Sequence, residues 1–203
     1  MGIDWWAFVG IVCLAYLVPG PDFAVVLREA TRSRRAGLLA AAGAQAGLCV
    51  HLLVAVLGLS LLLARSPEAL TAVRFVGAGY LVYLGLRILW STRSEAPASP
   101  PATPGPRAAF AHGFLTNLLN PKAVLFFAAI LPQFVVADAP VTPQIAALGA
   151  VDIVVGVLLW PLLVAFGVRL GALLARPAVR RGWDRLTGGV FVGLGGVLAG
   201  TEV

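Results

Sequence analysis

The sequence predicts an all-α integral membrane protein with six transmembrane helices, arranged as two inverted three-helix repeats whose first and fourth helices are broken. Three observations predict this fold. The chain is 60% hydrophobic and 12% charged with a mean hydropathy of +0.93, its apolar residues form long runs, and its arginines gather in alternate loops. Because a soluble domain has about 25% charged residues, we expect this chain to lie in a membrane.

Six apolar runs are candidates for membrane spans. A hydrocarbon core about 30 Å thick requires roughly 20 residues of helix. The runs are 5–27, 38–64, 70–90, 110–136, 143–168 and a shorter, glycine-rich run at 186–202. We expect residues 1–92 to form the first repeat and residues 108–203 the second. Segment 93–107, RSEAPASPPATPGPR, has no apolar periodicity and is predicted to be a flexible cytoplasmic linker.

The basic residues predict the orientation of the chain. Most of the 15 Lys and Arg residues lie near the ends of the first, third and fifth apolar runs or in the loops that follow them, whereas only Arg65 and Arg74 lie on the other side of the predicted membrane. By the positive-inside rule, the arginine-rich loops are cytoplasmic and both termini are non-cytoplasmic. Since these arginines fall in short loops, the net charge of +6 gives no reason to expect a nucleic-acid partner.

The two halves contain corresponding breaks. LVPGPDFAVV interrupts the first run and LLNPKAV the fourth, and the next run of each half contains an ionisable residue, His51 or Asp152. Because each half has three spans, the halves must insert with opposite orientations. Paired broken helices of this kind mark the binding site of secondary transporters with inverted repeats. A chance alignment of glycine-rich segments is the alternative.

Both breaks are typical of helix starts within the membrane. In Gly20-Pro21-Asp22 and Asn120-Pro121-Lys122, proline stands where its missing N–H is harmless, and Asn is a preferred N-cap. The positive end of a helix dipole attracts a carboxylate. Asp22 and Lys122 would then hold the ammonium and carboxylate groups of a zwitterion, which favours an amino-acid substrate. A purely structural Asp22–Lys122 ion pair is the alternative.

Three titratable residues inside the predicted spans are candidates for proton coupling: Asp22, Asp152 and His51. Ionisable groups at membrane depth are costly and are by default functional candidates. For His51, a hydrogen-bonded contact between helices is an equally good interpretation.

Other functions have less support in the sequence. The chain has two cysteines, one methionine and no intramembrane carboxylate cluster, so a metal-cation exporter would lack ligands, and we predict no metal site or cofactor. No serine has a convincing partner base and no H-E-x-x-H motif occurs, so an enzyme is not expected. A noncatalytic membrane scaffold is a further alternative, but it would leave the charges at the two breaks unexplained.

The chain resembles the LysE/RhtB family of amino-acid exporters along nearly its whole length. The resemblance rests on PGPD, GAQAGLCVHLLVAVLGLSLLL, GAGYLVYLGLRIL, GFLTNLLNPKAVLFFAAILPQF and DRLTGGVFVGLG, in this order. It implies a bacterial inner-membrane protein with six spans that exports amino acids or close derivatives in exchange for protons, and it leaves a homodimer open. It does not choose among lysine, threonine, homoserine, leucine and cysteine derivatives.

The resemblance also implies the site residues. By position, the first family motif corresponds to Pro19, Gly20, Pro21 and Asp22, and the second to Asn120, Pro121 and Lys122. We therefore expect these seven residues to bind the substrate. The sequence departs from the family pattern in the proline-rich linker and the short last run, neither of which contains a predicted site residue.

Overall fold

The computed structural model describes residues 2–18, 20–59, 105–136 and 139–174, together with isolated positions between 72 and 90 and between 176 and 196. Within these residues the chain is helical and contains no strand, as predicted. The elements are α1 (Trp5–Leu17), α2 (Pro21–Arg32), α3 (Arg34–Val54), the π-helical turn η1 (Ala55–Leu59), α6 (Pro106–Leu118), α7 (Pro121–Ala129), the 3-10 turn η2 (Leu131–Phe134) and α8 (Val141–Leu174).

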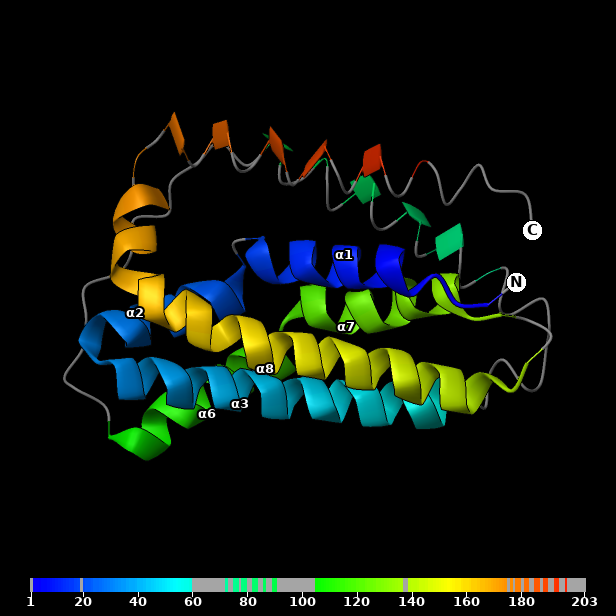
Figure 1. The fold of residues 1–203 in the computed structure, drawn as a ribbon, viewed down its shortest axis with the longest axis horizontal. Helices are drawn as coiled ribbons and strands as arrows, with labels where there is room; N and C mark the ends of the chain where they lie inside the picture. Colours follow the sequence, from blue (N-terminus) through cyan, green and yellow to red (C-terminus); the bar gives the residue numbers. More distant parts are fainter. Residues whose placement is uncertain are drawn as a thin grey trace.

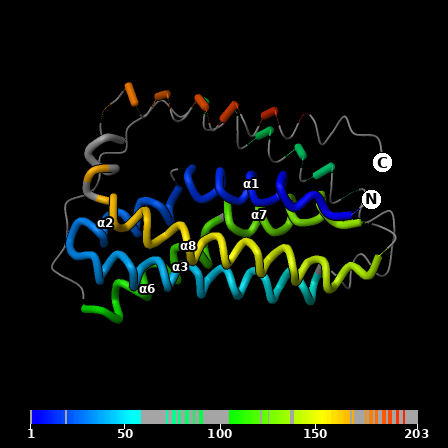
Figure 2. Tube along the Cα trace, viewed as in Figure 1, coloured from blue at the N-terminus to red at the C-terminus, as the bar shows by residue number. Residues whose placement is uncertain are grey.

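The helices are long and apolar enough for a membrane. Segments Arg34–Gly58 and Val141–Gly167 each meet the length of a span on their own. The pair α1 and α2, and the pair Pro106–Leu118 with Lys122–Phe134, reach that length only together, and each pair is bent by 57° at its break. The Cα trace in Figure 2 shows the first bend between α1 and α2. The interruptions predicted in the first and fourth runs are therefore present.

Several helix ends differ from the predicted bounds. Helix α6 begins at Pro106, inside the segment assigned to the linker. Helix α8 has 34 residues and is about 51 Å long, so it continues well beyond the predicted run 143–168. Hydropathy marks only the part of a helix that suits hydrocarbon, whereas backbone hydrogen bonding continues into polar residues. The predicted third and sixth spans and residues 93–104 lie outside the continuously described segments.

Local capping explains where α1 and α3 begin. The side chain of Asp4 accepts a hydrogen bond from the Ala7 N–H at 3.0 Å, and the side chain of Ser33 accepts one from Ala36 at the same distance. Each cap pairs an N–H group that the first turn of a helix cannot pair internally. Ser33 also ends α2, because its N–H donates to the Glu29 carbonyl. One residue thus joins α2 to α3.

Small residues allow α3 to pack closely along α6 (Figure 1). A Cβ atom on Gly43 would overlap the backbone of Phe110, and one on Gly113 would overlap the backbone of Ala40. Close backbone contact between small residues is a common way for membrane helices to associate. Helix α3 also contacts α2 and α8. The first half of the sequence is therefore packed directly against the second half.

Candidate functional site

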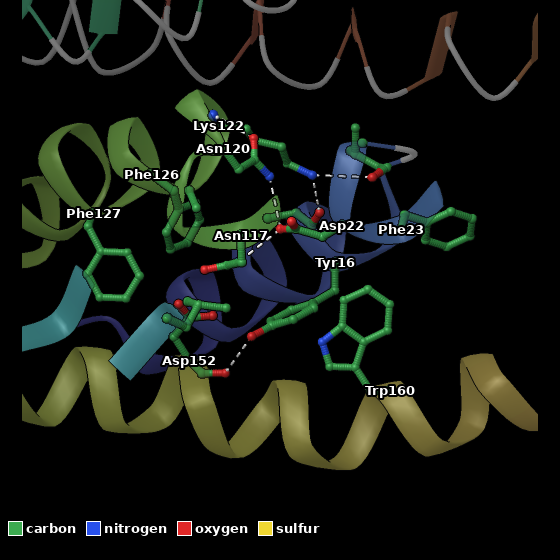
Figure 3. Close-up of a pocket in the computed structure, with 15 residues that line it drawn as sticks. Tyr16, Asp22, Phe23, Asn117, Asn120, Lys122, Phe126, Phe127, Asp152 and Trp160 are labelled. Atoms are coloured by element: carbon green, nitrogen blue, oxygen red, sulfur yellow. Dashed lines mark hydrogen bonds between the residues drawn. The ribbon is translucent and has the colours of Figure 1, made fainter. Parts of the chain in front are cut away.

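A pocket lies where the two breaks meet (Figure 3). Its volume is about 60 Å³, which gives room for roughly four to six water-sized groups at about 10–15 Å³ each. Aliphatic and aromatic side chains form much of the wall. The polar side chains that line it come from α1, α2, α6, α7, α8 and the second break: Tyr16, Asp22, Asn117, Asn120, Lys122, Asp152 and Trp160.

At the first break, the exposed carbonyl end of α1 is bound by a lysine from the other half. The Lys122 Nζ donates to the carbonyls of Ala15 at 2.6 Å and Val18 at 3.2 Å. The last carbonyls of a helix have no partner within the helix, and the negative end of its dipole favours a cation. Lys122 therefore stabilises the interruption that separates α1 from α2.

At the second break, two amides hold the acid of the first. Asn120 caps α7, since its Oδ1 accepts from the Lys122 N–H at 3.0 Å. The Nδ2 atoms of Asn120 and Asn117 both donate to Asp22 Oδ2, each at 2.9 Å. Hydrogen bonds to a charged group are stronger than those between neutral groups. The two breaks are thus joined directly, because side chains of the second break donate to the carboxylate and the backbone carbonyls of the first.

Asp22 and Lys122 line the same pocket without pairing directly. Among the described residues, the salt bridges within 4.0 Å are those of Glu29 with Arg32 and His112, and none joins Asp22 to Lys122. The structural ion pair considered from the sequence is therefore not present. Amides bind the acid and carbonyls bind the lysine, so each charged group retains capacity for a further partner.

On the opposite wall, Tyr16 connects three helices. Its hydroxyl lies 3.1 Å from Gln45 Oε1 and 3.3 Å from the backbone carbonyl of Asp152, and Gln45 Nε2 donates to the Ile153 carbonyl at 2.8 Å. A Cβ atom on Gly156 would overlap both the Tyr16 hydroxyl and the Gln45 amide. The glycine therefore lets this network reach the backbone of α8. Asp152, on α8, is 3% exposed and lines the pocket.

Four buried polar atoms at the pocket have no hydrogen-bond partner in the described part of the protein. They are Asp22 Oδ1, Asn117 Oδ1, Asp152 Oδ2 and Trp160 Nε1. Figure 3 shows the Trp160 nitrogen on the side of the indole that faces Tyr16. Buried polar groups are almost always hydrogen-bonded, and leaving one unpaired costs about 1–3 kcal/mol. These three acceptors and one donor match a polar ligand with several hydrogen-bonding groups.

The other predicted site residues are placed as follows. Gly20 lines the pocket, whereas Pro21 begins α2 and is exposed, and Pro121 begins α7. Pro19 lies outside the described residues. His51 is not among the residues that line the pocket, and its Nε2 lies 3.2 Å from the backbone carbonyl of Asn117. This geometry agrees with the contact between helices considered for His51 from the sequence.

Sequence reasoning missed Tyr16, Asn117 and Trp160. Asn117 carried a usable signal, since a polar amide inside an apolar run, three residues before Asn120, is costly in a membrane without a partner. The two aromatic residues carried no such signal. In a sequence this apolar, nothing distinguishes them from residues of the core or the membrane interface.

Comparison with known proteins decides the family. A family model described as the LysE type translocator matches residues 13–201, a range that includes both breaks. The chain belongs to this family. The resemblance inferred from the motifs is thereby confirmed, and family membership together with the apolar helices makes this a membrane protein.

Relatives in the family include named efflux proteins. The chain is 33% identical to the leucine efflux protein of Salmonella choleraesuis over 142 residues, which cover 69% of this chain and 67% of the relative. It is 29% identical to the homoserine/homoserine lactone efflux protein of Salmonella typhimurium over 202 residues, 98% of each chain. An uncharacterized membrane protein of Bacillus subtilis is 28% identical over 200 residues, 93% of this chain and 95% of the relative. No solved structure shows a significant match.

Proposed function

We propose that this protein is a secondary transporter that exports amino acids or close derivatives from the cytoplasm across the bacterial inner membrane, in exchange for protons. The observation that carries the proposal is the convergence of four unpartnered buried polar atoms on a pocket between two broken helices. Membership in a translocator family with leucine and homoserine efflux relatives supports the choice of substrate.

The proposed site binds both charged groups of an amino acid. Asp22 Oδ1, which has no protein partner, accepts from the ammonium group. The Lys122 ammonium has three N–H donors and gives two to backbone carbonyls, so one is available for the carboxylate. Gly20 provides no side-chain cap for α2, which favours an anion at the start of that helix. The proposed substrate-binding residues are Pro19, Gly20, Pro21, Asp22, Asn120, Pro121 and Lys122.

Proton coupling is assigned to the acids of the pocket. Asp152 and Asp22 both line it, and both are carboxylates at membrane depth, where a change of charge strongly affects stability. His51 is kept as a third candidate because its ring nitrogen contacts the backbone carbonyl of Asn117, a residue that lines the pocket. A carrier that exchanges protons for substrate needs at least one group whose protonation changes as the site changes its exposure.

The proposed topology has six helices in two inverted repeats, residues 1–92 and 108–203, joined by a linker whose predicted range 93–107 ends within the first turn of α6, with both termini outside the cytoplasm. The equal 57° bends of the two broken pairs support a repeat. All the polar residues named around the pocket belong to one chain.

Efflux from proteoliposomes tests the function. Vesicles containing the full chain are loaded with a mixture of labelled amino acids, and release is followed with and without an imposed proton gradient. We expect faster release of at least one amino acid than from protein-free vesicles, accelerated further by protons supplied from the opposite side. No release above the protein-free control contradicts the export function. Release that ignores the gradient contradicts only the exchange with protons.

A further inference from the structure

Asn117 lies between the two acids of the pocket and has a fixed orientation. Its Nδ2 donates to Asp22 Oδ2 at 2.9 Å, so the amide oxygen, Oδ1, points away from Asp22. Figure 3 shows this oxygen on the side of Asn117 that faces Asp152. Rotating the amide would set its oxygen against the Asp22 carboxylate. The hydrogen bond to Asp22 therefore keeps an acceptor directed away from Asp22.

The fold makes room for this amide. Asn117 is 1% exposed, and a Cβ atom on Gly47 would come within 2.7 Å of its Oδ1. A residue with a side chain at position 47 would therefore displace the amide. Despite this close packing, Oδ1 has no hydrogen-bond partner in the described part of the protein. The local structure thus buries an acceptor and leaves it for a group that enters the pocket.

The unpartnered atoms around Asn117 all require donors. Asp22 Oδ1, Asn117 Oδ1 and Asp152 Oδ2 are acceptors when both acids are ionised. A proton on Asp152 turns that carboxyl into a donor for one neighbouring acceptor. A primary ammonium group brings three N–H donors, one for each of the three acceptors. A proton and an ammonium group are therefore alternative ways to satisfy the same atoms.

We propose that the exchanged proton and the primary ammonium group of the substrate compete for the Asn117 and Asp152 acceptors, so that the pocket holds one or the other. This inference rests on the proposed export function and adds to it the step at which exchange is enforced. Binding of the substrate ammonium requires ionised Asp152 and so releases its proton. Protonation of Asp152 directs its O–H toward Asn117 and removes one ligand from the ammonium group.

The surroundings of Asp152 include other charged and titratable groups. Tyr16 on α1, Asp22 on α2 and Lys122 on α7 line the same pocket, and His51 on α3 contacts the Asn117 backbone. Taking Asp22 and Asp152 as ionised and Lys122 as protonated, this pocket has one excess negative charge. One proton neutralises it, whereas a zwitterionic amino acid brings a carboxylate with its ammonium group and leaves the sum unchanged. Competition at Asp152 therefore prevents the pocket from holding the proton and the ammonium group together, and the buried charge stays at zero or minus one.

Binding measurements on the unmodified full chain test the competition directly. The chain is placed in lipid nanodiscs and titrated with leucine and with homoserine by calorimetry, in buffers of different ionisation enthalpy, from acidic to alkaline pH. We expect the apparent affinity to weaken by about tenfold per pH unit on the acidic side. About one proton should be released per substrate bound there. Affinity that is independent of pH, with no proton released, overturns the inference.

The Asp152→Asn variant tests whether Asp152, rather than another acid, causes the pH dependence of substrate binding. The introduced amide can donate to Asn117 permanently, as a protonated carboxyl would, so we expect weak binding with no dependence on pH. Glu29→Gln is the matched control, because Glu29 is also a buried acid, 1% exposed, but pairs with Arg32 outside the pocket. The control should keep the pH dependence of the parent. If Asp152→Asn retains that dependence, the inference is wrong.

Substrate analogues probe the ammonium group itself. N,N-dimethylleucine keeps the positive charge but has a single N–H, so it should bind at least about tenfold more weakly than leucine, as expected when two charge-assisted hydrogen bonds are lost. Equal affinity for the two compounds contradicts the proposed acceptors. If the protein exports amino acids but the proton and the substrate do not compete, the proposed function holds and this inference is wrong. Failure of both efflux and binding removes the proposed function and the inference together.

Discussion

The two breaks bend the chain by the same 57° but are stabilised in different ways. The second break is closed by its own side chain, since Asn120 caps α7. The first has a glycine N-cap with no capping side chain, and its carbonyls are bound by Lys122 from the second break. The second break is therefore stabilised by its own residues, whereas the first break depends on Lys122 from the second.

Lys122→Met should have the largest effect, because it removes the cation that binds the carbonyl end of α1. We expect efflux in proteoliposomes to fall by about 100-fold, since two charge-assisted hydrogen bonds are lost and Asp22 loses its opposing charge. Arg107→Met, a loss of an exposed cation in α6, is the control and should stay near the parent rate. Unchanged efflux in the Lys122→Met variant would contradict the dependence of the first break on Lys122.

Asp22→Asn should have the next largest effect on efflux. The new amide can keep its oxygen toward the Asn117 and Asn120 donors, but these bonds lose their charge assistance, and the N–H₂ group replaces the Oδ1 acceptor proposed for the substrate ammonium group, whose hydrogen bond to a charged partner is worth about 1.5–3 kcal/mol. We expect efflux to fall by about 10- to 100-fold while the protein stays folded in the membrane. Asp4→Asn is matched in chemistry, because Asn also caps helices well and Asp4 is exposed at α1. Similar rates for the two variants would exclude a role for the Asp22 charge.

Asn120→Ala should lower stability as well as weaken the proposed binding site. It removes the cap of α7, worth about 0.5–2 kcal/mol, and one of the two amide bonds to Asp22. We expect a lower apparent melting temperature in detergent, measured by the loss of helical circular dichroism. An unchanged melting temperature would show that the second break does not depend on its cap.

Gly20→Ala should have the smallest effect, because the N-cap of the first break has no capping side chain to lose. Gly20 is extended, with φ −133°, and its added Cβ would lie at an ordinary 3.6 Å from the Lys122 side chain. We expect a loss of about 0.5 kcal/mol, the modest preference for glycine over alanine at an N-cap. A drop in melting temperature larger than that of Asn120→Ala would reverse the proposed roles of the two breaks.

Much of the site could be predicted from sequence because its signals are local. Helix starts at Pro21 and Pro121 follow from the chemistry of proline and N-caps, and both are present. Asp22, Lys122 and Asp152 were conspicuous as charges in apolar runs, and the structure brings all three to one pocket. Tyr16 and Trp160 could not be found in this way, since an aromatic residue in an apolar helix has no local signature.

The sequence by itself determined that this chain is a helical membrane protein, where two of its helices are interrupted and which charges lie at the interruptions. Hydropathy and helix capping depend on neighbouring residues, so they can be read along the chain. Only the tertiary structure decided that Lys122 binds a carbonyl 107 residues away and that Asn117 holds Asp22 across 95 residues. Those partners are chosen by how α1 and α2 pack against α6 and α7, and packing depends on the shape of the whole chain.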